Sequence, residues 1–369
     1  MDSYLSITSL QFKKYIIYDI FFTEQQVKLI IRKKKNLPNI LYKGQKPKII
    51  EGRGRHLEFV IYTFYMPVYE EKITMKIDGA DTLTSVNKYA DVKNEIIMTT
   101  VTKDQDNYII PWIEYYKHLG VTRFMIYDNS GRKTLGKVLE KYIQDKTVLL
   151  FDFGKKNIPY RVGRQLLAQP LQQNHSLHAF KNAQYIGMFD IDEYINPQKN
   201  FKCLPGMFRE LLIKYKTNYK KLAGFSFENR YFYNPKPKAD DSDFKHFTIG
   251  YCSKNTTGRF RKKMFINPRN VSYFTVHTLS SYTGNDIIVS PQLCFFNHYR
   301  YIGLKSRVGG SRSYKDLSIL RHLNWLDKNI LPSTRKEEKK LQKQGKKKKE
   351  VTKSQKKRRK MLRKKKKDN

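Results

Sequence analysis

The chain has 369 residues, a formal net charge of +40, 39% hydrophobic residues and 14% aromatic residues. This supply of apolar side chains is large enough for a packed core and argues against global disorder. Three widely spaced cysteines argue against a disulfide framework and against a cysteine-ligated metal site.

The positive charge is concentrated at the C-terminal end of the sequence. Residues 335–369 contain 20 Lys or Arg against 4 Asp or Glu, in a low-complexity run. We predict a disordered Lys/Arg-rich tail over residues 333–369, which would contact nucleic acid or another anionic surface. A basic nucleic-acid-binding protein is therefore an alternative function. No signal peptide or transmembrane segment is apparent, so we expect a cytoplasmic protein, with a viral origin as one option.

Residues 1–90 predict a small β-rich attachment. Short apolar runs at residues 58–65 and 72–77 have the composition of strands, and clusters of Gly, Pro and Lys separate them. The region offers no motif that indicates a function.

Residues 91–332 predict an α/β domain. Four apolar runs read as buried strands, at residues 95–101, 123–127, 147–153 and 185–189. Segments with helical spacing lie between them, at residues 108–119, 135–143 and 165–180. This alternation predicts a mostly parallel, Rossmann-like sheet with helices on both faces. Ligands of such sheets bind beyond the carboxyl ends of the strands, where Asp128 and Asp190 directly follow two of the runs.

Farther along, the elements are shorter. Residues 204–215 have helical spacing, and four further runs read as strands, at residues 223–227, 264–266, 271–277 and 293–296.

The acidic turn after the fourth strand is the chief chemical signal. On an extended backbone, residues two apart point the same way, so Asp190 and Asp192 would present two carboxylates to one cation. Mn²⁺ or Mg²⁺ would bridge them to a diphosphate, whose developing charge it would stabilise during sugar transfer. An ordinary acidic turn is the plain alternative, and a metal-dependent phosphotransferase or nuclease could use the same carboxylates.

Two histidines follow later strands. His298 would suit as a third metal ligand, and His277 is a similar candidate, although a hydrogen-bonded structural role is the commoner fate of a single histidine. Lys263, in the basic run 261–263, could pair with a diphosphate or lie in a surface cluster.

Four blocks of sequence, in order, carry a resemblance to a known family. They lie at residues 106–130, 189–195, 263–277 and 297–306. Together they resemble glycosyltransferase family 92 and its relatives in the family 2-like clan, which adopt the GT-A fold. The resemblance covers residues 95–301, a little over half of the chain.

The resemblance implies roles for individual residues. Asp190 and Asp192 match the metal- and diphosphate-binding pair, and His298 matches a histidine that ligates the metal. Five matched positions are implied to contact the donor: Asp128, Gln173, Asn174, Lys263 and His277. It further implies inversion at the anomeric carbon.

The sequence departs from the family where the catalytic base is expected. Asp241 and Asp243 are the nearest carboxylates there, and we predict them as the catalytic pair, with Glu228 as a third choice for the base. The predicted function is transfer of a hexose, galactose or a related sugar, from a UDP-sugar to a glycan or protein-linked acceptor.

Overall fold

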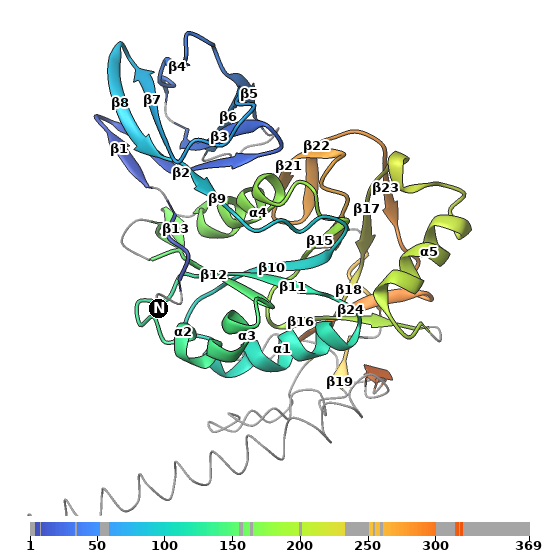
Figure 1. The fold of residues 1–369 in the computed structure, drawn as a ribbon. Helices are drawn as coiled ribbons and strands as arrows, with labels where there is room; N and C mark the ends of the chain where they lie inside the picture. The colour runs from blue at the N-terminus through green and yellow to red at the C-terminus, as the bar shows by residue number, and fades with distance from the viewer. Residues whose placement is uncertain are drawn as a thin grey trace, which may run out of the picture. The chain divides into compact units, whose positions relative to one another are not determined.

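Figure 1 shows the computed structural model, in which Met1–Ser318 form one compact unit. The residues that the structure describes are 4–7, 9–33, 35–51, 59–154, 158–162, 165–198, 201–232, 251–253, 255–258, 261–299, 314–316 and 318–319. The predicted tail over residues 333–369 lies outside them. No helix within the described ranges is long and apolar enough to cross a membrane.

The N-terminal region forms two sheets. A six-stranded sheet has the order β1-β2-β3-β6-β5, with β9 beside β2, and a three-stranded sheet has the order β4-β7-β8. Their bounds are Leu10–Phe12 (β1), Tyr15–Thr23 (β2), Gln26–Arg32 (β3), Ile40–Tyr42 (β4), Lys48–Ile50 (β5), Phe59–Tyr65 (β6), Lys72–Ile77 (β7), Ala80–Ser85 (β8) and Asn87–Lys88 (β9). Glu24 and Gln25 join β2 to β3 with positive φ angles of 46° and 59°, the backbone that a tight hairpin requires.

A seven-stranded sheet has the order β12-β11-β10-β15-β20-β17-β23. Its strands are β10 (Ile96–Thr102), β11 (Arg123–Asp128), β12 (Val148–Asp152), β15 (Tyr185–Met188), β17 (Leu222–Phe227), β20 (Lys263–Ile266) and β23 (Asn285–Ile288). The pairs among β12, β11, β10 and β15 are parallel, whereas β20 runs antiparallel to both β15 and β17. Gly187 lies at the centre of this sheet, where an added Cβ would come within 2.2 Å of Met98 Sδ.

A five-stranded sheet lies beyond the end of β15 and has the order β16-β24-β18-β19-β25. Its strands are β16 (Glu193–Pro197), β18 (Asn229–Phe232), β19 (Tyr251–Cys252), β24 (Cys294–Tyr299) and β25 (Tyr314–Lys315). Two hairpins complete the strands of the described chain: β13 (Arg161–Val162) with β14 (Gln165–Leu166), and β21 (Val271–Thr275) with β22 (Thr278–Tyr282).

The described residues contain few helices. These are α1 (Asp106–His118), α2 (Leu135–Val138), α3 (Glu140–Gln144), α4 (Ala168–Ala179), α5 (Leu204–Lys214) and the 3₁₀ turn Tyr219–Lys221. Every residue of α4 is buried, because the helix contacts β10, β21 and β2. Figure 1 shows α4 between the N-terminal strands and β15. One hydrophobic core accordingly includes Tyr18 and Ile61 of the N-terminal region together with Met125 and Leu171.

The predicted architecture, a mostly parallel GT-A sheet with helices on both faces, was wrong. In the described part of the chain strand accounts for 43% and helix for 19%, in mixed and antiparallel sheets. The prediction extended the strand–helix alternation of residues 95–189 over the whole domain. After Asp190, however, α5 is the one α-helix that the described residues contain, so helices that could serve as crossovers between parallel strands are few. The later strands pair with partners distant in the sequence, antiparallel for β20 with β15 and for β16 with β24, and parallel for β18 with β24.

A buried hydrogen-bond network joins the N-terminal sheet to α4. Asp19 of β2 is fully buried, and its Oδ2 lies 2.7 Å from His175 Nε2 and accepts from Tyr89 OH at 2.5 Å. Its Oδ1 accepts from Asn87 Nδ2 at 2.8 Å. His175 Nδ1 lies 2.7 Å from the hydroxyl of Tyr127 in β11. The N-terminal region is thus tied to the central sheet by polar contacts as well as by apolar packing.

Candidate active site

The acidic segment after β15 folds as a turn that its own side chains hold. The backbone N–H of Glu193 donates to Asp190 O at 3.1 Å, and the N–H of Asp190 donates to Glu193 Oε2 at 2.9 Å. Residues 191 and 192 lie in the turn, and β16 begins at Glu193. The extended backbone that we expected across this segment is therefore absent, and Asp190 and Asp192 contact different partners.

Lys263 is the partner of Asp190. It is the first residue of β20, which pairs with β15, and its side chain is 1% exposed. Its Nζ lies 2.7 Å from Asp190 Oδ2 and 2.9 Å from Glu193 Oε2. Gln169 of α4 donates to the other oxygen of Asp190 at 2.7 Å. One buried ammonium group thus contacts two carboxylates, those of Asp190 and Glu193.

Burial and charge act in opposite directions on these groups. Burial disfavours the ionised form of Asp190, but the charge and hydrogen bond of Lys263 outweigh it and hold the pKa of Asp190 below its usual value. Burial raises the pKa of Glu193 to about 7, with the negative charge of Asp190 adding to the increase. Burial would lower the pKa of Lys263, yet Asp190 and Glu193 raise it. Lys263 therefore stays charged, and Glu193 is the carboxylate of the pair that takes up a proton more easily.

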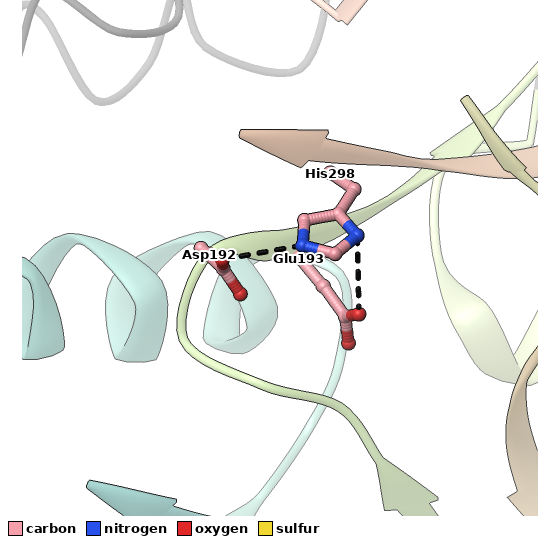
Figure 2. Close-up of side chains that lie close together, drawn as sticks. All are labelled: Asp192, Glu193 and His298. Atoms are coloured by element: carbon pink, nitrogen blue, oxygen red, sulfur yellow. Dashed lines mark ion pairs between the residues drawn. The ribbon is translucent and has the colours of Figure 1, made fainter. Parts of the chain in front are cut away.

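His298 brings Asp192 and Glu193 together (Figure 2). In the register of the antiparallel pair β16–β24, Glu193 lies directly opposite His298. His298 Nε2 is 3.3 Å from Asp192 Oδ2, and His298 Nδ1 is 3.6 Å from Glu193 Oε1. The Tyr299 N–H donates to Asp192 O at 2.8 Å and fixes the turn against β24. Although burial alone would lower it, the pKa of His298 is raised by Asp192 and then Glu193.

The donor set of this Asp192–Glu193–His298 cluster fits a divalent cation. One ligand atom from each residue lies within 4.8 Å of the others. His298 Nδ1 is buried and makes no hydrogen bond with any described residue, so it has a lone pair or proton to spare. Two carboxylates and one imidazole combine hard oxygen ligands with a borderline nitrogen, which suits Mn²⁺. The predicted ligands Asp192 and His298 lie in the cluster, whereas Glu193 occupies the place that we predicted for Asp190.

Asp128 has local partners of its own. It ends β11, is 1% exposed, and accepts from the Ser130 N–H at 2.8 Å and from the Tyr4 hydroxyl at 2.7 Å. It shares a sheet edge with Asp190, but β10 lies between β11 and β15, which separates the two residues by about 10 Å. A nucleotide-sugar donor that bound at Asp128 would therefore meet a carboxylate that Tyr4 already contacts.

Gln173 and Asn174 of α4 differ in their surroundings. Asn174 is fully buried and pairs with β21, because its Oδ1 accepts from Phe274 N and its Nδ2 donates to Phe274 O. Gln173 is 2% exposed, and its Oε1 has no hydrogen-bond partner among the described residues. It lies one helical turn from Gln169, the residue that contacts Asp190, and so faces the same side of α4.

His277 lies next to the site without joining the cluster. Its Nδ1 is 3.3 Å from the carbonyl oxygen of Lys262, and burial, followed by the charge of Lys263, lowers the pKa of His277 to about 4. The imidazole is therefore neutral. The predicted catalytic pair, Asp241 and Asp243, lies outside the described residues.

Glu193 and Gln169 were not among the site residues predicted from the sequence. Glu193 immediately follows Asp192, and recognising a strand at residues 193–197 would have shown that its side chain pairs across to β24. Gln169 precedes Gln173 by four residues, the spacing that places two side chains on one face of a helix.

Comparison with known proteins gives this site its context. The model of glycosyltransferase family 92 matches residues 98–366. Curated relatives include family 92 proteins of Arabidopsis thaliana, 24% identical over 61% of this chain, of Ricinus communis, 21% over 62%, and of Oryza sativa subsp. japonica, 23% over 56%. The aligned part is 38%, 42% and 33% of those proteins, so the chain spans less than half of their length.

These matches place the chain among the glycosyltransferases. More narrowly, it belongs to glycosyltransferase family 92, because the family model covers well over half of its residues. The matched region contains the Asp192–Glu193–His298 cluster together with Asp190 and Lys263, and it begins after the N-terminal sheets.

Proposed function

We propose that this glycosyltransferase is metal-dependent and moves a hexose, galactose or a related sugar, from a UDP-sugar to a glycan or protein-linked acceptor with inversion. The observation that carries the proposal is the Asp192–Glu193–His298 cluster, two carboxylates and an imidazole gathered at the end of β15. Family membership supports the reaction type.

The side chains of the site have two different roles, metal binding and the positioning of Asp190. Asp192, Glu193 and His298 would hold Mn²⁺ or Mg²⁺, which when bound supplies positive charge to the departing diphosphate. Lys263 and Gln169 keep the carboxylate of Asp190 in one orientation. The side chain of Asp190 is 36% exposed, so it can still accept a hydrogen bond from a hydroxyl group of the donor sugar.

Inversion requires a single displacement. The acceptor oxygen forms a bond to the anomeric carbon as the bond from that carbon to the diphosphate oxygen breaks, and the hydroxyl proton passes to a carboxylate. Asp241 and Asp243 remain our predicted bases.

The test is donor turnover by the full chain with a panel of nucleotide sugars, with and without Mn²⁺. We expect one UDP-hexose to be hydrolysed slowly, and faster when an acceptor is present, only when the metal is added. Asp192→Asn keeps the volume of the side chain but removes a ligand charge, so we expect turnover to fall at least about a hundredfold. Asp81→Asn in β8 makes the same change on an exposed residue and is the matched control.

Two results would contradict the proposal. One is metal-independent turnover that Asp192→Asn leaves intact, which would show that the cluster holds no catalytic cation. The other is metal-dependent cleavage of a simple phosphodiester with no turnover of any nucleotide sugar, which would assign the same carboxylates to a phosphodiesterase.

A further inference from the structure

A second group of polar side chains lies on the N-terminal sheet, on a different sheet from the Asp192–Glu193–His298 cluster. Lys28 of β3 is directly opposite Thr63 of β6, and Thr63 is directly opposite Lys48 of β5. Residues that are paired across neighbouring antiparallel strands project from the same face of a sheet. The three side chains therefore form a row across β3, β6 and β5.

The C-terminal end of α4 meets this row. Lys28 Nζ is 3.3 Å from His178 Nδ1, and His178 Nε2 is 2.9 Å from Ser272 O. Since a carbonyl oxygen only accepts, Nε2 carries the imidazole proton, and Nδ1 accepts from the ammonium group of Lys28. Lys181 follows α4 by two residues and donates to Val271 O at 2.8 Å. We call Lys28, Lys48, Thr63, His178 and Lys181 the basic cluster.

The basic cluster has hydrogen-bonding capacity that the described residues do not use. Lys28 is 4% exposed and carries three N–H donors, of which one is accounted for by His178. Thr63 is 7% exposed, and its hydroxyl has no partner among the described residues. Leaving such buried groups unpaired is costly, so a ligand that accepts from them would be bound favourably.

Among the described residues, the basic cluster also has no acidic partner. No carboxylate of the described residues forms an ion pair with Lys28, Lys48 or Lys181. Glu24, exposed in the β2–β3 turn, acts on Lys28 and Lys181 only through its more distant charge. Burial, followed for Lys28 by the charges of its neighbours, lowers the pKa of each of these two lysines to about 8. The positive charges of Lys28, Lys48 and Lys181 thus lie near one another on one face of the N-terminal sheet.

We propose that the basic cluster binds a phosphate group, free or as the monoester of a small soluble molecule. A tetrahedral oxyanion offers several acceptor oxygens at once, which matches the unused donors of Lys28 and Thr63 and the charges of Lys181 and Lys48. Lys48 is exposed, so the anion can approach from that side. The basic cluster is separate from the transfer chemistry and does not depend on the proposed function.

The experiment is thermal unfolding and titration calorimetry of the full chain at constant ionic strength, in chloride buffer without phosphate. Inorganic phosphate and glucose 6-phosphate are the two probes. We expect saturable binding, with the folded-to-unfolded ratio rising about tenfold at ten times the dissociation constant. The tighter probe identifies whether the free anion or the monoester is the better ligand.

Three variants locate the effect. Lys28→Met keeps the aliphatic stem and should abolish the phosphate-dependent stabilisation. Lys48→Met changes an exposed residue, so the variant should fold, and it should bind phosphate severalfold more weakly. Lys76→Met removes the same charge from an exposed position of β7 and should leave binding unchanged. Absence of saturable binding to the unmodified chain would overturn the proposal, as would binding that both Lys28→Met and Lys48→Met retain in full. If Lys28→Met fails to fold, full binding by Lys48→Met alone overturns it.

Discussion

The buried contact of Asp19 with His175 provides a sharp test of how the N-terminal sheet is held. Asp19→Ala removes a fully buried carboxylate that accepts from Ile20 N, Asn87 Nδ2 and Tyr89 OH and lies 2.7 Å from His175 Nε2. Both side chains are 1% exposed, so water cannot replace the lost acceptor. Each buried donor left unpaired costs about 1–3 kcal/mol, so we expect a total loss of about 3–5 kcal/mol of unfolding free energy. Asp19→Asn keeps the shape and one acceptor oxygen, so we expect a smaller loss of about 1–3 kcal/mol.

The measurement is equilibrium denaturation by urea, followed by circular dichroism and by tryptophan fluorescence. Asp81→Asn, on an exposed residue of β8, should stay within about 0.5 kcal/mol of the unmodified protein. A double-mutant cycle of Asp19→Ala with His175→Phe should give a coupling energy of about 1–3 kcal/mol. If Asp19→Ala shifts stability no more than Asp81→Asn does, the two residues are not a buried, mutually dependent pair.

Three further predictions concern other parts of the molecule. Gly284 and Gly79 have φ angles of +85° and +86°, but a Cβ on Gly284 would lie 2.5 Å from Lys221 O, whereas Gly79 has open space. In a denaturation experiment Gly79→Ala should cost about 1–2 kcal/mol of unfolding free energy, and Gly284→Ala should cost more. Equal losses for the two variants would contradict the steric argument. The pKa of Lys28 is about 8 in the folded chain and 10.5 ordinarily, so the unfolded state binds more protons between these values. The free energy of unfolding should therefore rise with pH by up to about 1.4 kcal/mol per pH unit from this group over pH 8–9.5. Lys28→Met should remove that rise, and an unchanged dependence of stability on pH would show that folding does not lower the pKa of Lys28. Chelation by EDTA should abolish donor turnover and Mn²⁺ should restore it, whereas turnover that survives chelation would exclude a catalytic cation.

The first half of the matched region was predictable because its signals are local. The apolar runs at residues 95–101, 123–127 and 185–189 became β10, β11 and β15, and the helical spacing before Asp190 became α4. Each of these elements is long enough, and buried enough, for its hydrophobic pattern to show.

The later strands were harder to predict because their pairing depends on distant residues. β16 has five residues and begins within the acidic turn, and its partner β24 lies about a hundred residues farther on. The same is true of the site. Asp192 and His298 could be proposed from their residue types, but the contact of Lys263 with two carboxylates arises only when β20 pairs with β15. Nor does any pattern in residues 1–90 show that Asp19 pairs with His175.

The N-terminal sheet and α4 share one hydrophobic core, so the start of the family match is not a boundary of the folded structure. The family match begins at residue 98, inside β10, whereas Phe21 and Ile61 of the N-terminal strands pack with Leu171 of α4. A gene fragment cut at the start of the family match would split a central strand and uncover one side of α4, whose residues are all buried. The region that the family model matches is therefore smaller than the unit that must be expressed, and recombinant fragments should begin before β1.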